Sequence, residues 1–174
     1  MYNKKGFKES CKKWAAKPNN DHKLSDIYDG RIWKKFKDPN EDRLFFRHDV
    51  SDSNLGIMLN LNWFQLFDNF QYSIGVIYGV ICNLPRSERF KTSNTITLAV
   101  IPGSGEPKLH KLNYYLASII DQFIELWKGI DILTNETSSK HIRAAIICCA
   151  CDIPAARNSV GSYRLVPLVI YVKR

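Results

Sequence analysis

The 174-residue sequence has no apolar run near the roughly 18 consecutive residues that a membrane-spanning helix needs. The first residues, Met-Tyr-Asn-Lys-Lys-Gly, also lack the apolar stretch of a secretory signal. These absences argue against a membrane or secreted protein, and we expect an intracellular one. With 45% apolar and 24% charged residues, the composition is that of one ordinary globular domain.

The sequence has few cysteines, and their number is odd. There are five cysteines, three of them crowded into Cys148, Cys149 and Cys151, which is unlike a disulfide framework and favours a reducing compartment. Neighbouring strand residues point to opposite faces, and no second Cys or His pair follows at zinc spacing, so small buried side chains are favoured over metal ligands.

Other catalytic signatures are also missing. The histidines show no pairing, Gly103-Ser-Gly105 lacks the Lys-Ser/Thr of a phosphate-binding loop, and no serine or cysteine nucleophile motif is present. No helix-turn-helix or zinc finger is recognisable either. The histidines are His22, His48, His110 and His141.

Positive charge is concentrated near the amino terminus. The net charge is +8, and residues 1–48 hold thirteen Lys/Arg against seven Asp/Glu. Such a segment is either a basic arm that contacts phosphates or a solvated linker. Within it, Tyr28, Trp33 and Phe36 around Gly30 favour a short packed helix or turn over aromatics that stack on bases, and residues 1–24 are expected to be loose.

The periodicity of the remainder predicts a β-β-β-α-β order. Three runs rich in β-branched residues, joined by short loops, predict an antiparallel meander. A stripe of apolar residues at three- and four-residue spacing predicts a helix over 109–127 that Gly129 ends. After a polar connector over 135–140, an apolar run predicts a central parallel strand over 141–151. The three meander strands are expected at 57–63, 72–81 and 95–101.

Two positions bear on chemistry. Asp152 directly follows the last predicted strand, which is how phosphoryl-transfer folds present a carboxylate to a metal ion. It also stands two residues before Pro154, so the structural alternative is a cap at a helix amino terminus; the two roles do not exclude each other. The first strand, where a companion acid is expected, carries Asn62 instead.

Five short motifs occur in a fixed order along the chain. They are Asp26-Ile-Tyr-Asp-Gly30, Trp63-Phe-Gln-Leu-Phe67, Asn83-Leu-Pro-Arg-Ser-Glu-Arg-Phe90, Ile101-Pro-Gly103 and Cys151-Asp-Ile-Pro-Ala-Ala-Arg157. In this order and spacing they resemble the transposase domains of CACTA (En/Spm-like) DDE transposons. The similarity runs from about Asp26 to Arg157 and implies an RNase H-like core that is incomplete at its carboxyl end.

The resemblance implies a site in which three acids hold two divalent ions, Mg²⁺ or Mn²⁺, that cut and rejoin transposon ends. Asp152 matches the second acid and is the expected metal ligand. Asn62 occupies the position of the first acid, and its neutral amide removes a negative charge, so we expect severely reduced or absent nuclease activity. Asp68, in the following loop, is a poor geometric substitute.

Beyond Arg157 the sequence departs from the family pattern, which continues through a Cys-x-x-Cys element to a helix with the third acid. Residues 158–174 contain no cysteine and no acid. We therefore expect a truncated or degenerate member with a basic arm and packed aromatic element at 1–48, a partial transposase domain at 49–157 and an unmatched tail. The implied location is the nucleus.

The implied partners are DNA and possible fellow transposase subunits. Two functions follow for the present chain. It is either a metal-dependent DNA nuclease and strand transferase, or a non-catalytic module for DNA binding or transposase assembly. Asn62 and the absent third acid favour the second for present activity.

Overall fold

The computed structural model describes residues 2–16, 24–38, 41–67, 70–103, 109–134 and 138–151. The chain forms two compact units. Unit 1 combines Met1–Gly56, Ile81–Asn94 and Glu125–Ala145. Unit 2 combines Ile57–Val80, Thr95–Ile124 and Ile146–Arg174.

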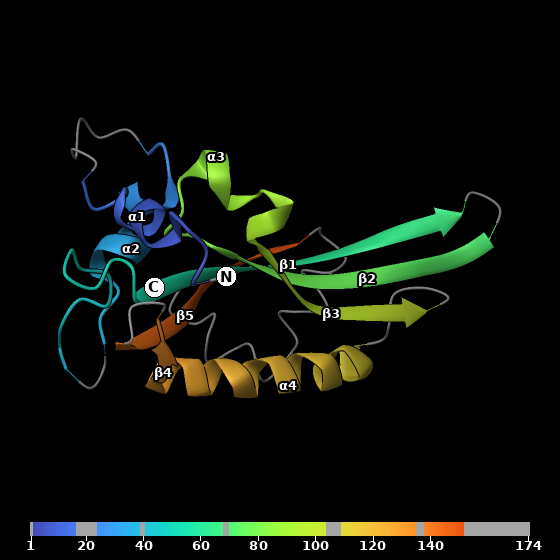
Figure 1. The fold of residues 1–174 in the computed structure, drawn as a ribbon. Helices are drawn as coiled ribbons and strands as arrows, with labels where there is room; N and C mark the ends of the chain where they lie inside the picture. The colour runs from blue at the N-terminus through green and yellow to red at the C-terminus, as the bar shows by residue number, and fades with distance from the viewer. Residues whose placement is uncertain are drawn as a thin grey trace. The chain divides into compact units, whose positions relative to one another are not determined.

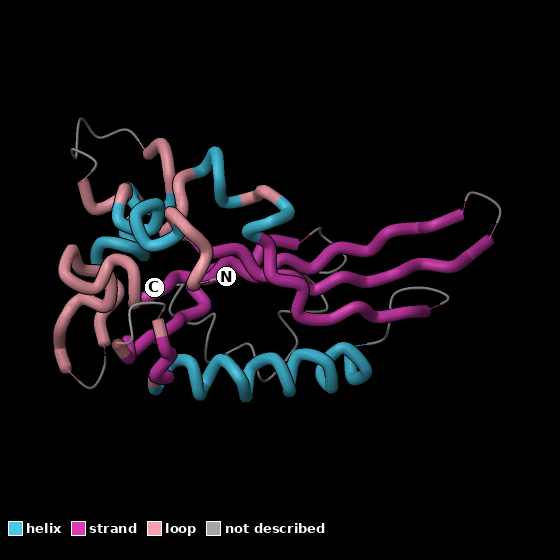
Figure 2. The backbone as a smooth tube through the Cα atoms, in the orientation of Figure 1, coloured by secondary structure: helices cyan, strands magenta, loops and turns pink. Residues whose placement is uncertain are grey.

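The protein is a mixed α/β protein with a five-stranded sheet in the order β3-β2-β1-β5-β4 (Figures 1 and 2). The β2–β3 and β4–β5 pairs are antiparallel. β5 lies beside β1, and the two strands run in the same direction (Figure 1). The strands are β1 (Asn54–Phe67), β2 (Phe70–Ile81), β3 (Thr95–Gly103), β4 (Ile130–Leu133) and β5 (Ser139–Cys151).

The four predicted strands are all present, with ends that extend the predicted ranges. The sequence analysis missed β4, which pairs with the first residues of β5 from Ile130 opposite Ile142 to Leu133 opposite Ser139. Ile130 is 41% exposed and Leu133 is 77% exposed, so this short strand buries little apolar surface. It therefore lacks the pattern by which the other strands are recognised.

Helix α4 (Leu109–Lys128) confirms the predicted apolar stripe. Five of its apolar side chains are buried, and the helix ends at Gly129, whose φ of 107° is a conformation that side-chain-bearing residues rarely adopt. No helix among the described residues is long and apolar enough to cross a membrane. The buried residues of α4 are Leu112, Leu116, Ile119, Ile120 and Phe123.

The expectation of a loose segment over 1–24 is wrong for its described part. Residues Phe7–Lys12 form helix α1, and Phe7 and Cys11 on it are buried at 4% and 0% exposure. These two residues lie four positions apart, on one face of a helix. Burial of that face against unit 1 orders a segment that its lysines alone would leave in solvent.

The aromatic element of unit 1 packs as predicted. A short 3-10 helix η1 (Ile27–Asp29) begins at Asp26, whose side chain accepts from the Ile27 N–H, and α2 (Arg31–Lys35) follows. Tyr28 and Trp33 are buried at 8% and 2% exposure. The remaining short helices of unit 1 are α3 (Arg86–Arg89) and η2 (Thr92–Asn94).

Two stacked aromatic pairs organise the interior of unit 1. Trp33 stacks on Phe46 with ring centroids 3.8 Å apart, and Phe45 stacks on Trp127 at 5.0 Å. Phe45 and Phe46 meet edge to face, which joins the two pairs. Large aromatic side chains bury much apolar area each, so this cluster is a principal source of the stability of unit 1.

Candidate functional site

Asn62 lies on β1 within unit 2 and is half-buried. Its Nδ2 donates to the hydroxyl of Tyr78 on β2 over 3.4 Å. Trp63 follows it, and the Trp63 ring lies over Gly75 of β2 so closely that any Cβ at position 75 would collide with it. The asparagine is thus held by a tyrosine hydroxyl on one face of the sheet, while the Trp63 indole packs on the opposite face.

One backbone hydrogen bond aligns the first part of β5 with the start of β1. The Arg143 N–H donates to the Ser53 carbonyl at 2.9 Å, which in a parallel ladder pairs Arg143 with Asn54. Counted forward without a bulge, this register predicts that Cys151 lies opposite Asn62. Asp152 lies outside the described residues, as do Asp68 and residues 158–174, so the two predicted site positions are joined only through the strand that precedes Asp152.

The described residues by themselves do not fit a divalent-metal site. No three His, Cys, Asp or Glu side chains in the described ranges lie close enough together to hold an ion. Asn62 offers one neutral amide oxygen, whereas Mg²⁺ prefers carboxylates. We therefore derive no catalytic step through a metal, and the role expected of Asp152 stays a prediction.

Arg89, from the Asn83-to-Phe90 motif, is a buried structural hub of unit 1. Its Nη2 donates to Asp26 Oδ1 at 2.8 Å, to the Tyr28 hydroxyl at 2.9 Å and to the carbonyls of Cys82 and Leu84 at 3.0 Å each. Burial lowers the pKa of Arg89, but the hydrogen bond to Asp26 and the neighbouring groups outweigh this and raise it. The guanidinium stays charged and joins η1 to the α3 region.

Burial also governs the tyrosine in this hub. Tyr28 donates its hydroxyl proton to the Leu84 carbonyl at 2.7 Å. Burial raises the pKa of Tyr28 to about 12, against the opposing influence of Arg89. The phenol is therefore a neutral donor at physiological pH and not an acid-base group.

Asn83, at the start of the same motif, is fully buried. Its Oδ1 accepts from the Gly56 N–H at 2.8 Å, and its Nδ2 donates to the carbonyls of Ser51 and Asn54 at 3.0 Å each. This one amide satisfies three backbone groups where the chain enters β1. The motif residues Asn83 and Arg89 therefore have structural contacts, and nothing in their geometry presents them to a ligand.

The buried carboxylates of unit 1 are committed to cations. Asp52, with a side chain 3% exposed, meets Lys140 at 2.7 Å and Lys12 at 3.4 Å. Asp38 forms an ion pair with Arg143, whose guanidinium also lies over the Trp127 ring at 4.9 Å. Burial pushes the pKa of Asp52 up, but the hydrogen bonds and charges of Lys140 and Lys12 outweigh it, so the pKa lies below its usual value.

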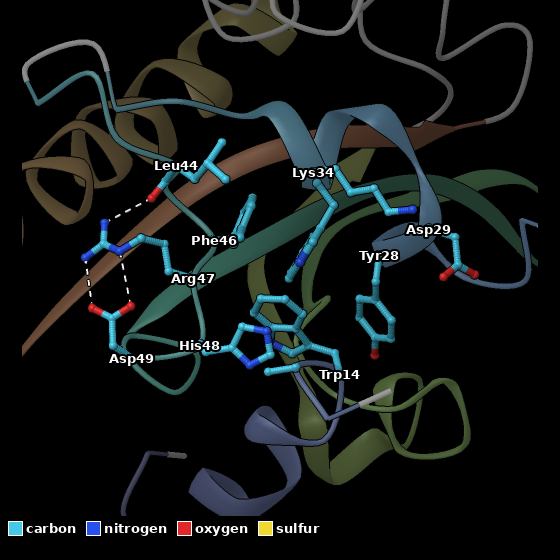
Figure 3. A pocket seen from close by; sticks show the side chains of 11 residues that line it. Trp14, Tyr28, Asp29, Lys34, Leu44, Phe46, Arg47, His48 and Asp49 are labelled. Carbon is cyan, nitrogen blue, oxygen red and sulfur yellow. Dashed lines mark hydrogen bonds and ion pairs between the residues drawn. The ribbon is translucent and has the colours of Figure 1, made fainter. Parts of the chain in front are cut away.

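A pocket of about 530 Å³ opens within unit 1 (Figure 3). The sequence pattern identifies Tyr28 and Trp33 as packing or stacking residues but does not predict the pocket, because Trp14 comes from one separate segment and Phe46 and His48 come from another. Trp14 meets Trp33 edge to face at 5.1 Å and lies 6.2 Å from both Tyr28 and His48, centroid to centroid. The rest of the lining is Ala15, Asp29, Lys34, Leu44, Arg47 and Asp49.

The comparisons with known proteins give one match. No curated protein and no solved structure matches the chain. The model of a family described as "Transposase family tnp2" matches residues 21–165, which is most of the chain. This range includes every motif on which the resemblance to a transposase rests, together with Asn62, Asp152 and the pocket residues from Tyr28 onward. The protein therefore belongs to the tnp2 transposase family and is derived from a transposable element.

Proposed function

We propose that the chain descends from a DDE transposase of the CACTA (En/Spm-like) type with an RNase H-like core. The order β3-β2-β1-β5, with α4 between β3 and β5 in sequence and β5 parallel to β1, supports this assignment. The ancestral activity is then metal-dependent cleavage and transfer of DNA strands at transposon ends, and the working location is the nucleus. The proposed boundaries remain 1–48, 49–157 and 158–174.

We further propose that the chain itself binds DNA without cutting it. The observation that carries this proposal is Asn62, a neutral side chain on β1 at the position expected for the first acid, with its amide engaged by Tyr78. Asp152, one residue beyond β5, would supply one carboxylate for Mg²⁺ or Mn²⁺. A single carboxylate neutralises the dication poorly, and two-metal chemistry needs several.

The test restores the missing charge. Asn62→Asp is expected to bind Mn²⁺ at least about tenfold more tightly than the unchanged chain, by isothermal titration, because one further carboxylate faces the ion. Nicking of a supercoiled plasmid, measured in Mg²⁺ and in Mn²⁺, reports whether the Asn62→Asp variant also cleaves DNA. The unchanged chain is expected to show neither tight binding nor nicking.

Two further variants make the result specific. Gln65→Glu adds the same charge to an exposed position of β1 on the opposite face of the strand and is expected to change nothing. Asn62→Asp combined with Asp152→Ala is expected to lose the gain. If the unchanged chain nicks DNA, or if Asn62→Asp and Gln65→Glu behave alike, the assignment of position 62 is wrong.

DNA binding is supported by the family and by the charge of the chain. We expect the affinity for a labelled duplex, by fluorescence anisotropy, to fall steeply with salt, with a slope of about −0.9 per phosphate contacted. Asp152→Ala should leave this binding unchanged. Binding that depends on Asp152 and on Mg²⁺ would instead favour the nuclease, while tight association with an intact transposase subunit but not with DNA would favour an assembly module.

A further inference from the structure

The aromatic pocket of unit 1 has the size and lining of a ligand site. At about 530 Å³ it falls within the range of roughly 300–1,000 Å³ typical of such sites. Figure 3 shows Trp14, Tyr28, Phe46 and His48 gathered around it, from three segments of the chain. None of these side chains belongs to the Asn62 and Asp152 region, so this pocket is separate from the proposed metal site.

Two indole groups in the pocket lack a hydrogen-bond acceptor. Within the described part of the chain, the Nε1 atoms of Trp14 and Trp33 are buried and have no partner. A buried donor without an acceptor costs about 1–3 kcal/mol. Trp33 is fixed by its stack on Phe46, whereas Trp14 is only half-buried and has more room to move. A bound ring would therefore reach both indole N–H groups if the Trp14 side chain rotates toward it.

The charges around the pocket distinguish between possible ligands. Asp29 accepts hydrogen bonds from Ser25 and from the Asp26 N–H, and Asp49 is held by Arg47 through two hydrogen bonds of 3.1 Å. Asp49 is thus paired with a cation and Asp29 already accepts three hydrogen bonds, whereas the two indole N–H groups have no acceptor among the described residues. The pocket favours a neutral, flat ring with acceptor atoms.

Cationic side chains lie on the helix that carries one of the pocket aromatics. Helix α2, which carries Trp33, also presents Arg31, Lys34 and Lys35 to solvent. Lys34 lines the pocket itself (Figure 3). Nucleobases carry carbonyl and ring-nitrogen acceptors, stack on aromatic side chains and are joined to phosphates that such cations attract.

We propose that this pocket receives one unpaired nucleobase of the bound DNA. The inference rests on the proposed DNA binding and adds the place and form in which the DNA is held. The base is taken out of its helix and lies among the aromatic side chains of the pocket, where its acceptors meet the indole N–H groups of Trp14 and Trp33. Base pairing competes with this contact, so unpaired positions bind in preference to a continuous duplex.

The experiment uses the full chain and two labelled duplexes that differ at one position, where 2-aminopurine is either paired or unpaired. The duplex with the unpaired base is expected to bind at least about fivefold more tightly, since base stacking on aromatic side chains is worth about 1–3 kcal/mol. Its 2-aminopurine fluorescence should be quenched on binding by the aromatic side chains around it. Circular dichroism checks that each variant is folded.

Three variants test the pocket. Trp14→Ala should abolish the preference and the quenching, and Trp14→Phe, which keeps a ring but removes the donor, should reduce the preference severalfold. Trp127→Phe is the control, because Trp127 packs in unit 1 outside the pocket lining. It should leave the preference unchanged.

The outcomes separate the two proposals. If paired and unpaired duplexes bind equally, with salt dependence and no effect of Trp14→Ala, the pocket inference fails while DNA binding stands. If neither duplex binds, both proposals fail. Binding of a trimethyl-lysine peptide that depends on Trp14, without preference for the unpaired base, would overturn the inference in favour of a cation site.

Discussion

Replacing Arg89 by methionine should remove a large part of the stability of unit 1. The side chain of Arg89 is 6% exposed and that of its partner Asp26 is 10% exposed, with the charged atoms 2.8 Å apart. The substitution keeps much of the volume but leaves a shielded carboxylate, the Tyr28 hydroxyl and the Cys82 carbonyl without the guanidinium. Breaking a buried pair in this way costs about 3–5 kcal/mol, against a total of about 5–15 kcal/mol for a typical domain.

The assay is urea unfolding of the full chain, followed by far-ultraviolet circular dichroism. Lys128→Met is the matched control, because Lys128 and Glu125 are also 2.8 Å apart but their side chains are 64% and 66% exposed. An exposed pair of this kind contributes about 0.5 kcal/mol or less. The comparison therefore isolates burial, since the distance between the charges is the same in both pairs.

The double variant Arg89→Met with Asp26→Asn completes a cycle. Removing both charges should cost less than the sum of the single changes, because neither charge is then left buried alone. A loss below about 1 kcal/mol for Arg89→Met, or a loss equal to that of Lys128→Met, would show that solvent reaches the pair and would refute the reasoning.

Two further predictions follow from unit 1. Asn83→Ala should cost about 2–4 kcal/mol in the same unfolding assay, because three buried backbone groups lose their partner; Asn83→Asp should cost at least as much, since its carboxylate faces two carbonyls, and near-wild-type stability of either variant would contradict this account. Asp52 has a folded pKa below its unfolded value, so its stabilising contribution is full above about pH 4 and is lost as the pH falls through the lower folded pKa. Asp52→Asn should therefore flatten the acid limb of the stability profile, and an unchanged limb would show that Asp52 does not contribute.

The sequence predicts the main elements well because their side chains repeat with the period of the structure. The four long strands and α4 are present, and Gly129 ends the helix as expected. The sequence pattern does not predict β4, because the apolar residues at its two ends are exposed. It does not predict α1 either, because this six-residue helix lies among lysines and only the spacing of Phe7 and Cys11 indicates a helix. Local pattern is weakest where an element is shorter than two turns or pairs only at an edge.

Long-range polar contacts explain the rest of the difference. The Asp26 and Arg89 motifs were identified as parts of a transposase pattern, but their partnership spans 63 positions and no periodicity predicts it. The pocket is assembled in the same way from Trp14, Tyr28, Phe46 and their neighbours. At the predicted metal site the structure describes Asn62 only, and the role of Asp152 stays a prediction.

Positions 62 and 75 differ in how much change the fold tolerates. An asparagine has the shape of an aspartate, and the Asn62 amide has a partner in the Tyr78 hydroxyl, so exchange of one residue for the other disturbs the fold little. One strand away, Gly75 tolerates no such exchange, because any side chain there would collide with the Trp63 ring. A substitution at position 62 can therefore change the charge of the strand at little cost in stability, whereas any substitution of Gly75 should reduce the stability of unit 2.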